Sequence, residues 1–93
     1  MTDWRVTLSF TAPYPVRQET AQALWGLGDH FTSLPGARTY QWAATASADT
    51  IVAAAEHVAF RLASALRVAD MGEPEVFAME VERLHPLRSQ QAP

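Results

Sequence analysis

The chain has 93 residues, of which 48% are apolar and 18% charged, and its net charge is −3. This length and composition fit a single soluble domain with a modest core and exclude an extensively disordered chain. The basic residues are seven scattered arginines and cysteine is absent, which excludes disulfides and argues against nucleic-acid binding. No apolar run approaches the ~20 residues of a membrane-spanning helix. The opening MTDWRVTLSF does not resemble a secretory signal, so we expect a cytoplasmic protein.

The segment from Trp4 to Ala12 alternates apolar and polar side chains, which predicts a strand with one buried face. Pro13 and Pro15 end the strand, because proline has no N–H to donate to a ladder. The side chains divide into an inner set, Trp4, Val6, Leu8 and Phe10, and an outer set, Arg5, Thr7, Ser9 and Thr11.

A first helix is predicted from Val16 to Phe31, followed by a loop over residues 32–36 that contains the turn signal LPG. Gly26 and Gly28 are poor helix formers, so we expect the last turns to be weak or tightly packed. Trp25 falls opposite the inner stripe of this helix. The members of that stripe are Val16, Thr20, Ala23, Leu24, Leu27 and Phe31.

The segment from Ala37 to Ser47 has β character, with alternation that weakens at Ala43 and Ala44. The pattern fits either one long strand or two short strands that meet at a tight turn near Gln41 and Trp42. No glycine or asparagine marks such a turn, so both possibilities stay open.

The longest helical pattern runs from Asp49 to Ala69, with Asp49 as the expected N-cap. The many alanines on its inner face imply close packing on a sheet. Phe60 is expected on the outer face, about half a turn from the core, at ~100° per residue. The inner stripe contains Ile51, Ala55, Val58, Leu62, Leu66 and Ala69, widened by Val52, Ala59, Ala63 and Ala65.

A last strand is predicted from Glu75 to Leu84, with Phe77, Met79 and Val81 facing inward. Residues 1–86 would form the domain, and residues 87–93 a flexible tail. On the outer side of this strand, Glu80 and Glu82 would form a solvated acidic edge that Arg5 or Arg83 can neutralise across strands. Val76 and Ala78 complete that outer set.

The element order is β-α-β(β)-α-β, which predicts a ferredoxin-like α+β sandwich. Two helices would cover one face of a sheet of three or four mainly antiparallel strands. Right-handed crossovers favour placing both helices on the same face. The other face would be open and of mixed polarity.

Five segments resemble those of short, mostly uncharacterised actinobacterial and actinophage proteins: WRVTLSF, ALWGLGDHF, GARTYQ, TASADTIVAAAEHVAFRLASAL and VFAMEVERL. The resemblance implies a ferredoxin-like fold and no particular activity. The resemblance to the actinophage proteins in particular implies a phage accessory protein that binds and modulates a host protein. The segment between Gly36 and Asp49 is shorter than the corresponding hairpin of those proteins.

The function that the residues favour is protein binding without catalysis, because aromatic and arginine side chains dominate interaction hot spots. The predicted partner-binding surface consists of Trp25, Phe60, Arg61 and Arg67, with Tyr40 and Trp42 as further aromatic candidates. No phosphate-binding loop and no nucleophile motif is present, so we expect no catalytic residue and no cofactor.

Three alternatives to this prediction stay open. The first is a homodimer formed through the open sheet face at Thr7, Ser9, Val76 and Ala78. The second and third are a small-ligand sensor and a minor enzyme. A metal site is not expected, because His30, His57 and His85 lie in different elements without the spacing of a ligand pair.

Overall fold

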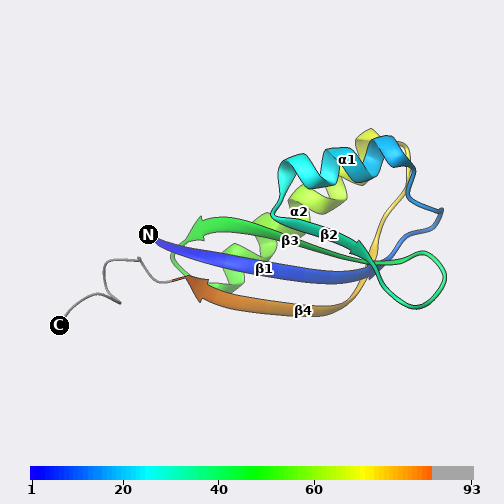
Figure 1. Cartoon of the computed structure of the whole chain (residues 1–93). Coiled ribbons are helices and arrows are strands. Elements are labelled where there is room, and N and C mark those ends of the chain that lie inside the picture. The colour runs from blue at the N-terminus through cyan, green and yellow to red at the C-terminus, as the bar shows by residue number, and fades with distance from the viewer. Residues whose placement is uncertain (85–93) are drawn as a thin grey trace.

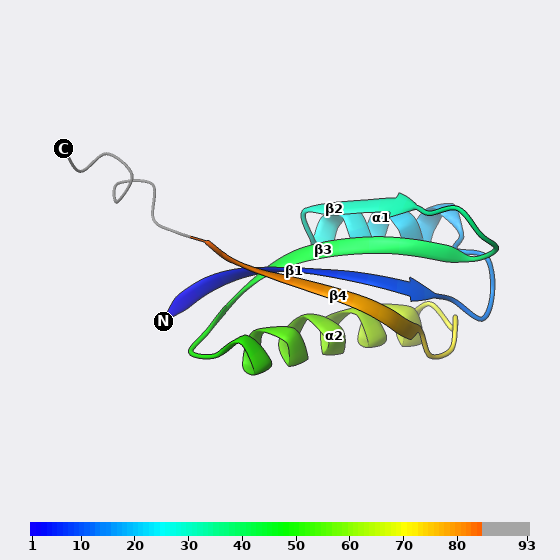
Figure 2. The ribbon, with the colours of Figure 1, turned by 90° about the horizontal axis from the view of Figure 1, so that it is seen from below.

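The structure, a computed structural model, describes residues 1–84. Two helices cover one face of a four-stranded sheet (Figure 1). The elements are β1 (Thr2–Thr11), α1 (Gln18–Leu27), β2 (His30–Ser33), β3 (Thr39–Ala48), α2 (Ile51–Val68) and β4 (Glu75–Leu84). The strands lie in the order β2-β3-β1-β4, and each neighbouring pair is antiparallel (Figure 2). This arrangement is ferredoxin-like and confirms the predicted fold class.

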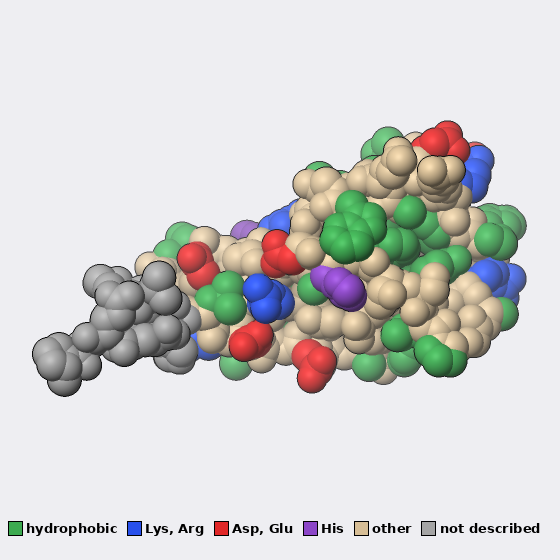
Figure 3. Space-filling model, in the orientation of Figure 1, with side chains coloured by type: hydrophobic (Ala, Val, Ile, Leu, Met, Phe, Trp, Pro, Cys, Tyr) green, Lys and Arg blue, Asp and Glu red, His purple; other side chains and the backbone are tan. Residues whose placement is uncertain are grey.

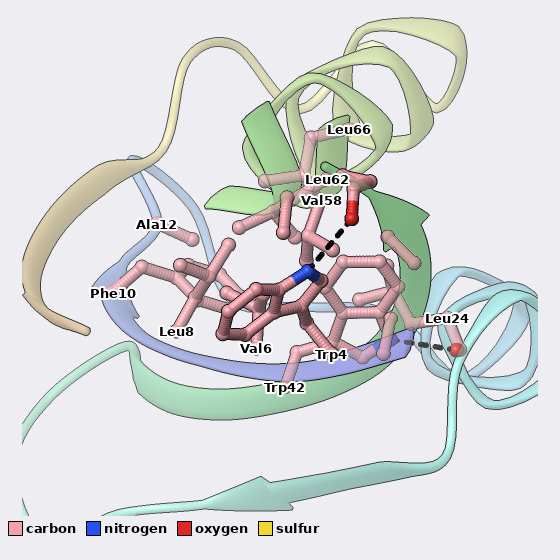
Figure 4. Packing of buried hydrophobic residues seen from close by; sticks show 14 of the residues in the cluster. Trp4, Val6, Leu8, Phe10, Ala12, Leu24, Trp42, Val58, Leu62 and Leu66 are labelled. Atoms are coloured by element: carbon pink, nitrogen blue, oxygen red, sulfur yellow. Dashed lines mark hydrogen bonds between the residues drawn. The ribbon is translucent and has the colours of Figure 1, made fainter. Parts of the chain in front are cut away.

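Strand β1 lies between β3 and β4 and supplies much of the core, as its alternation predicts. Trp4, Val6, Leu8 and Phe10 are all buried. The indole Nε1 of Trp4 donates to the carbonyl of Ala48 at 3.0 Å, which satisfies its one polar atom inside the core (Figure 4).

Helix α2 packs against β3 and β1 through small and branched side chains. Its fully buried residues, Ala54, Val58, Leu62 and Leu66, recur every four positions. They face buried alanines of β3, including Ala44 and Ala46, so helix and sheet approach closely. This confirms the close packing that the alanines predict.

Two details at the start of α2 differ from the prediction. The N-cap is Thr50, whose hydroxyl accepts from the N–H of Ala53 at 3.1 Å, and not Asp49. Ile51 was expected in the inner stripe but is exposed, as is Val52. The buried stripe begins one turn later, where the helix first meets the sheet.

Helix α1 is shorter than predicted, and the prediction of helix and loop over residues 28–33 is wrong. The helix ends at Leu27, and His30–Ser33 pairs with β3 as an edge strand. Gly28 permits this close turn, because a Cβ there would lie 2.5 Å from the carbonyl oxygen of Ala43 and 2.6 Å from Nε1 of Trp42. A residue with a side chain would prevent the chain from turning back so tightly against β3.

Strand β3 is one long strand, and its hairpin partner is β2. The turn between them contains Gly36 and Arg38, both with positive φ, a backbone conformation that several types of tight turn use. Trp42 lies fully buried near the centre of β3, and its Nε1 donates to the carbonyl of Leu24 at 2.8 Å (Figure 4). This bond ties α1 to the sheet.

Strand β4 has the predicted bounds but not the predicted facing of all its side chains. Its register to β1 shifts between Ser9 and Phe10, so Ala78 lies opposite Ser9 while Val76 lies opposite Phe10. Phe77 is the extra residue of this bulge. Val76 therefore lies on the helix-covered face of the sheet and not on the open face. Residues 85–93, which include the predicted tail and His85, lie outside the described part.

Candidate functional site

Within residues 1–84, strand β4 carries a run of apolar side chains that the helices leave exposed. It packs chiefly against β1, whereas α2 lies over β3 and β1. Val76, Phe77 and Met79 are 38%, 58% and 45% exposed, although Phe77 and Met79 were predicted to face inward. Only Val81 of the predicted inner set packs against the core. We call Val76, Phe77 and Met79 the β4 apolar strip.

The β4 apolar strip lies along the longer of the two sheet edges. Strand β2, at the other edge, has only four residues, whereas β4 has ten. Proteins commonly protect long edges with charges, proline or a covering helix. Here charge protects one side, where Glu80 and Glu82 lie on the open face opposite Thr7 and Arg5.

The predicted partner-binding aromatic residues Trp25 and Phe60 are 51% and 69% exposed. Trp25 contacts His30 of β2 edge to face, with ring centroids 5.9 Å apart. Phe60 lies on the side of α2 opposite the buried residues Val58 and Leu62. Within residues 1–84 no hydrogen bond, ion pair or aromatic contact joins Trp25 to Phe60.

The two predicted arginines are engaged within the molecule. Arg61 donates to the carbonyl of Thr45 at 3.2 Å, and Arg67 pairs with Glu73 at 3.3 Å. The Arg67 pair is exposed, so it contributes little to stability and can be exchanged for a partner's carboxylate. Arg61 is half-buried and holds the helix to β3, which makes it a poorer contact residue.

The prediction that Trp42 could bind a partner is wrong, and Tyr40 is half-buried and engaged within the molecule. Trp42 is fully buried. Tyr40 stacks on Phe31 at 5.5 Å between ring centroids and packs against the core. Its hydroxyl accepts from the N–H of Val16 at 3.0 Å, which anchors the chain entering α1.

The predicted self-association residues do not lie on one face. Thr7, Ser9 and Ala78 share the open face, where Ser9 is opposite both Gln41 and Ala78. Val76 lies on the other face because of the bulge at Phe77. Ser9 is also buried, so it offers little surface to a second copy.

The open face holds a polar hollow that the sequence did not reveal. It has a volume of about 410 Å³ and is lined by Arg5, Thr7, Asp29, His30, Gln41, Ala43 and Glu80. Figure 3, drawn in the orientation of Figure 1, shows acidic, basic and histidine side chains that gather beside a large apolar side chain. The pairing of β2 with β3 is what brings His30 to this face.

The arginine that lines the hollow, Arg5, forms ion pairs with two carboxylates. Arg5 lies 3.7 Å from a carboxylate oxygen of Asp29 and 3.8 Å from one of Glu82. The contact with Glu82 confirms the predicted pairing of Arg5 with the acidic residues of β4. Asp29 also accepts from the Thr45 hydroxyl at 2.7 Å. These are exposed, long ion pairs, which are worth ~0–1 kcal/mol each. The arrangement can hold a small polar ligand but does not exclude water from it.

The predicted helix from Val16 to Phe31 would have placed His30 in its last turn. It is instead the first residue of β2, and its ring packs against Trp25. Within residues 1–84 no group of three or more histidine, aspartate or glutamate side chains could hold a metal ion. No helix in the same range is long and apolar enough to cross a membrane.

Comparison of the chain with known proteins finds no match among family models, curated proteins or solved structures. The resemblance to actinobacterial and actinophage proteins stays a prediction. The function must therefore be argued from the surfaces of the molecule.

Strand β2, which brings His30 to the open face, had a signal in the sequence. HFTS carries phenylalanine and threonine, follows Gly28 and precedes the LPG turn, which together are typical of a short strand and a hairpin. The exposure of β4 had no such signal, because its apolar residues have the pattern of core residues in an ordinary amphipathic strand.

Proposed function

We propose that the protein is a non-enzymatic protein–protein interaction module that binds its partner along β4. The observation that carries this proposal is the β4 apolar strip, exposed on a ten-residue edge strand. Exposed apolar side chains that are contiguous, and not scattered singly, are typical of interaction surfaces. The resemblance to actinophage proteins makes a host protein the first partner to test.

Two side chains of the predicted helix surface extend this proposal. Trp25 and Phe60 are large, exposed and rigid, as interaction hot spots commonly are. They lie on α1 and α2 and not on β4. A partner that covers β4 would not need them, so the two surfaces make separable predictions.

The experiment is affinity capture from an actinobacterial lysate with four baits: wild type, Phe77→Glu with Met79→Glu, Trp25→Ala, and Phe60→Ala. We expect the β4 double variant to lose the partner, while the two helix variants keep it. Reconstitution with the purified partner and light scattering should give a complex of defined stoichiometry.

Loss of capture with Trp25→Ala or Phe60→Ala, and not with the β4 variant, would move the binding surface to the helices. A wild-type bait that retains no protein in stoichiometric amount would contradict the interaction proposal itself. Circular dichroism of each bait checks that the fold is intact.

Self-association through the open face is the competing proposal, with less support. That face carries the Arg5 ion pairs and the buried Ser9, and its polar groups would have to lose water on dimerisation. Light scattering of wild type and of Thr7→Arg tests it: a dimer that the substitution dissociates would favour the open face over β4.

A further inference from the structure

In the described part of the chain, residues 1–84, no strand pairs with the outer edge of β4, and the register assigns the backbone donors and acceptors on that edge. Ala12 donates to the carbonyl of Arg38 at 2.9 Å, and residues of an antiparallel strand turn their backbone groups alternately to the two neighbours. Even-numbered residues of β1 therefore bond to β3, and Arg5, Thr7 and Ser9 bond to β4.

The register then places the free groups on β4. Glu82, Glu80 and Ala78 lie opposite Arg5, Thr7 and Ser9 and use their backbone groups on β1. Met79 and Val81 alternate with them, so their N–H and C=O groups point away from β1 toward the free edge. Beta-strand addition by an extended peptide uses an edge of this kind.

The two faces of this edge differ in chemistry. Met79 and Val81 lie opposite Leu8 and Val6, so their side chains are on the helix-covered face. Glu80 and Glu82 are on the open face, and both are exposed. An added strand would meet apolar side chains on one face and carboxylates on the other.

A second copy of β4 is a poor occupant of this edge. In an antiparallel pair with its twofold axis at Met79, Glu80 or Val81, glutamates of the two copies fall opposite or diagonal to each other. Like charges at such positions are destabilising. The charge pattern therefore disfavours self-pairing and favours a segment of the opposite charge.

We infer that β4 binds its partner by strand addition, and that the bound segment is an extended peptide of another protein with alternating apolar and basic residues. This inference rests on the proposed interaction function and specifies its mode. Apolar residues of the peptide would pack beside Met79 and Val81, and its lysine or arginine residues beside Glu80 and Glu82.

The probes are three short labelled peptides: alternating valine and lysine, alternating valine and glutamate, and a block peptide with the composition of the first. Fluorescence anisotropy at low salt measures their affinity for the full chain. We expect the alternating lysine peptide to bind about tenfold more tightly than either of the others, because several cross-strand charge pairs act together. Amide hydrogen exchange should slow at Met79 and Val81 on binding.

Two variants at one position test the role of the backbone. Met79→Pro removes the N–H at the free edge without breaking a bond to β1, whereas Met79→Thr keeps it. We expect about tenfold weaker binding for Met79→Pro than for Met79→Thr. The double variant Glu80→Lys, Glu82→Lys should reverse the peptide preference, so that the alternating glutamate peptide binds more tightly than the alternating lysine peptide.

Three results would overturn the inference: no binding of any peptide, equal binding of the alternating and block lysine peptides, or an unchanged preference after the charge reversal. If these occur while the Phe77→Glu, Met79→Glu bait still loses its captured partner, strand addition is wrong and the interaction proposal stands. If the lysine peptide binds as expected but no partner is captured, the mode stands and the proposed cellular role fails.

Discussion

The two edges of the sheet show how differently similar side chains can be used. At the β2 edge, Phe31 stacks on Tyr40 and the neighbouring Trp42 is fully buried under α1. At the β4 edge, Phe77 and Met79 remain exposed. The difference lies in the covering element: α1 contacts β2, while α2 lies over β3 and β1 (Figure 1). Whether an apolar residue of a strand becomes core thus depends on what lies above it, and the following substitutions measure that dependence.

The largest effect is expected for Trp42→Ala in the covered half of the molecule. Removing the buried indole leaves a cavity and deprives the Leu24 carbonyl of its donor, which should cost ~3–5 kcal/mol of unfolding free energy. Urea unfolding followed by far-UV circular dichroism measures the loss. The same substitution at the exposed Trp25 is the control, and it should cost about 1 kcal/mol or less. Equal losses at the two tryptophans would contradict the packing described.

A smaller effect is expected at the glycine that lets the chain approach Trp42. Gly28→Ala places a Cβ against the Ala43 carbonyl and the indole, so we expect a destabilisation of ~1–3 kcal/mol.

Gly26→Ala is the matched control, because it lies in α1 and a Cβ at this position would meet no atom within 4 Å. It should instead raise stability by up to ~1 kcal/mol through helix propensity. Thermal or urea unfolding compares the two. The same sign for both variants would show that the tight turn after α1 does not limit the fold.

The smallest effect is expected on β4. Met79→Ala should lower the unfolding free energy by less than about 1 kcal/mol, because nearly half of the side chain is already in water. Leu8→Ala, directly across the ladder and fully buried, should cost ~2–5 kcal/mol. A large loss for Met79→Ala would show that the β4 apolar strip is core, and the binding proposal would lose its main support.

Much of the fold was predictable because its strongest local patterns agree with the tertiary structure. The alternation of apolar and polar residues in β1 identifies all four of its core residues. The apolar repeat of three and four residues along α2 identifies Val58, Leu62 and Leu66. The bounds of β4 also follow from the sequence. These segments are long, and each buries one regular face, so period alone is informative.

The candidate site was less predictable, because it depends on short and irregular segments. Phe31 continues the helical spacing of Leu24 and Leu27, so the helix pattern runs through a segment that pairs with β3. One bulge residue at Phe77 then moves Val76 to the other face, and period-two reasoning cannot detect an inserted residue.

The sequence by itself determined the class of fold, five of the six elements (β1, α1, β3, α2 and β4) and the main core residues, since these follow from hydrophobic period and from proline and glycine breaks. Only the tertiary structure decided which apolar residues stay uncovered. Helix α2 can lie over only part of the sheet, and its alanines hold it against β3 and β1. Strand β4 is left outside that cover, with an apolar strip on one face and glutamates on the other.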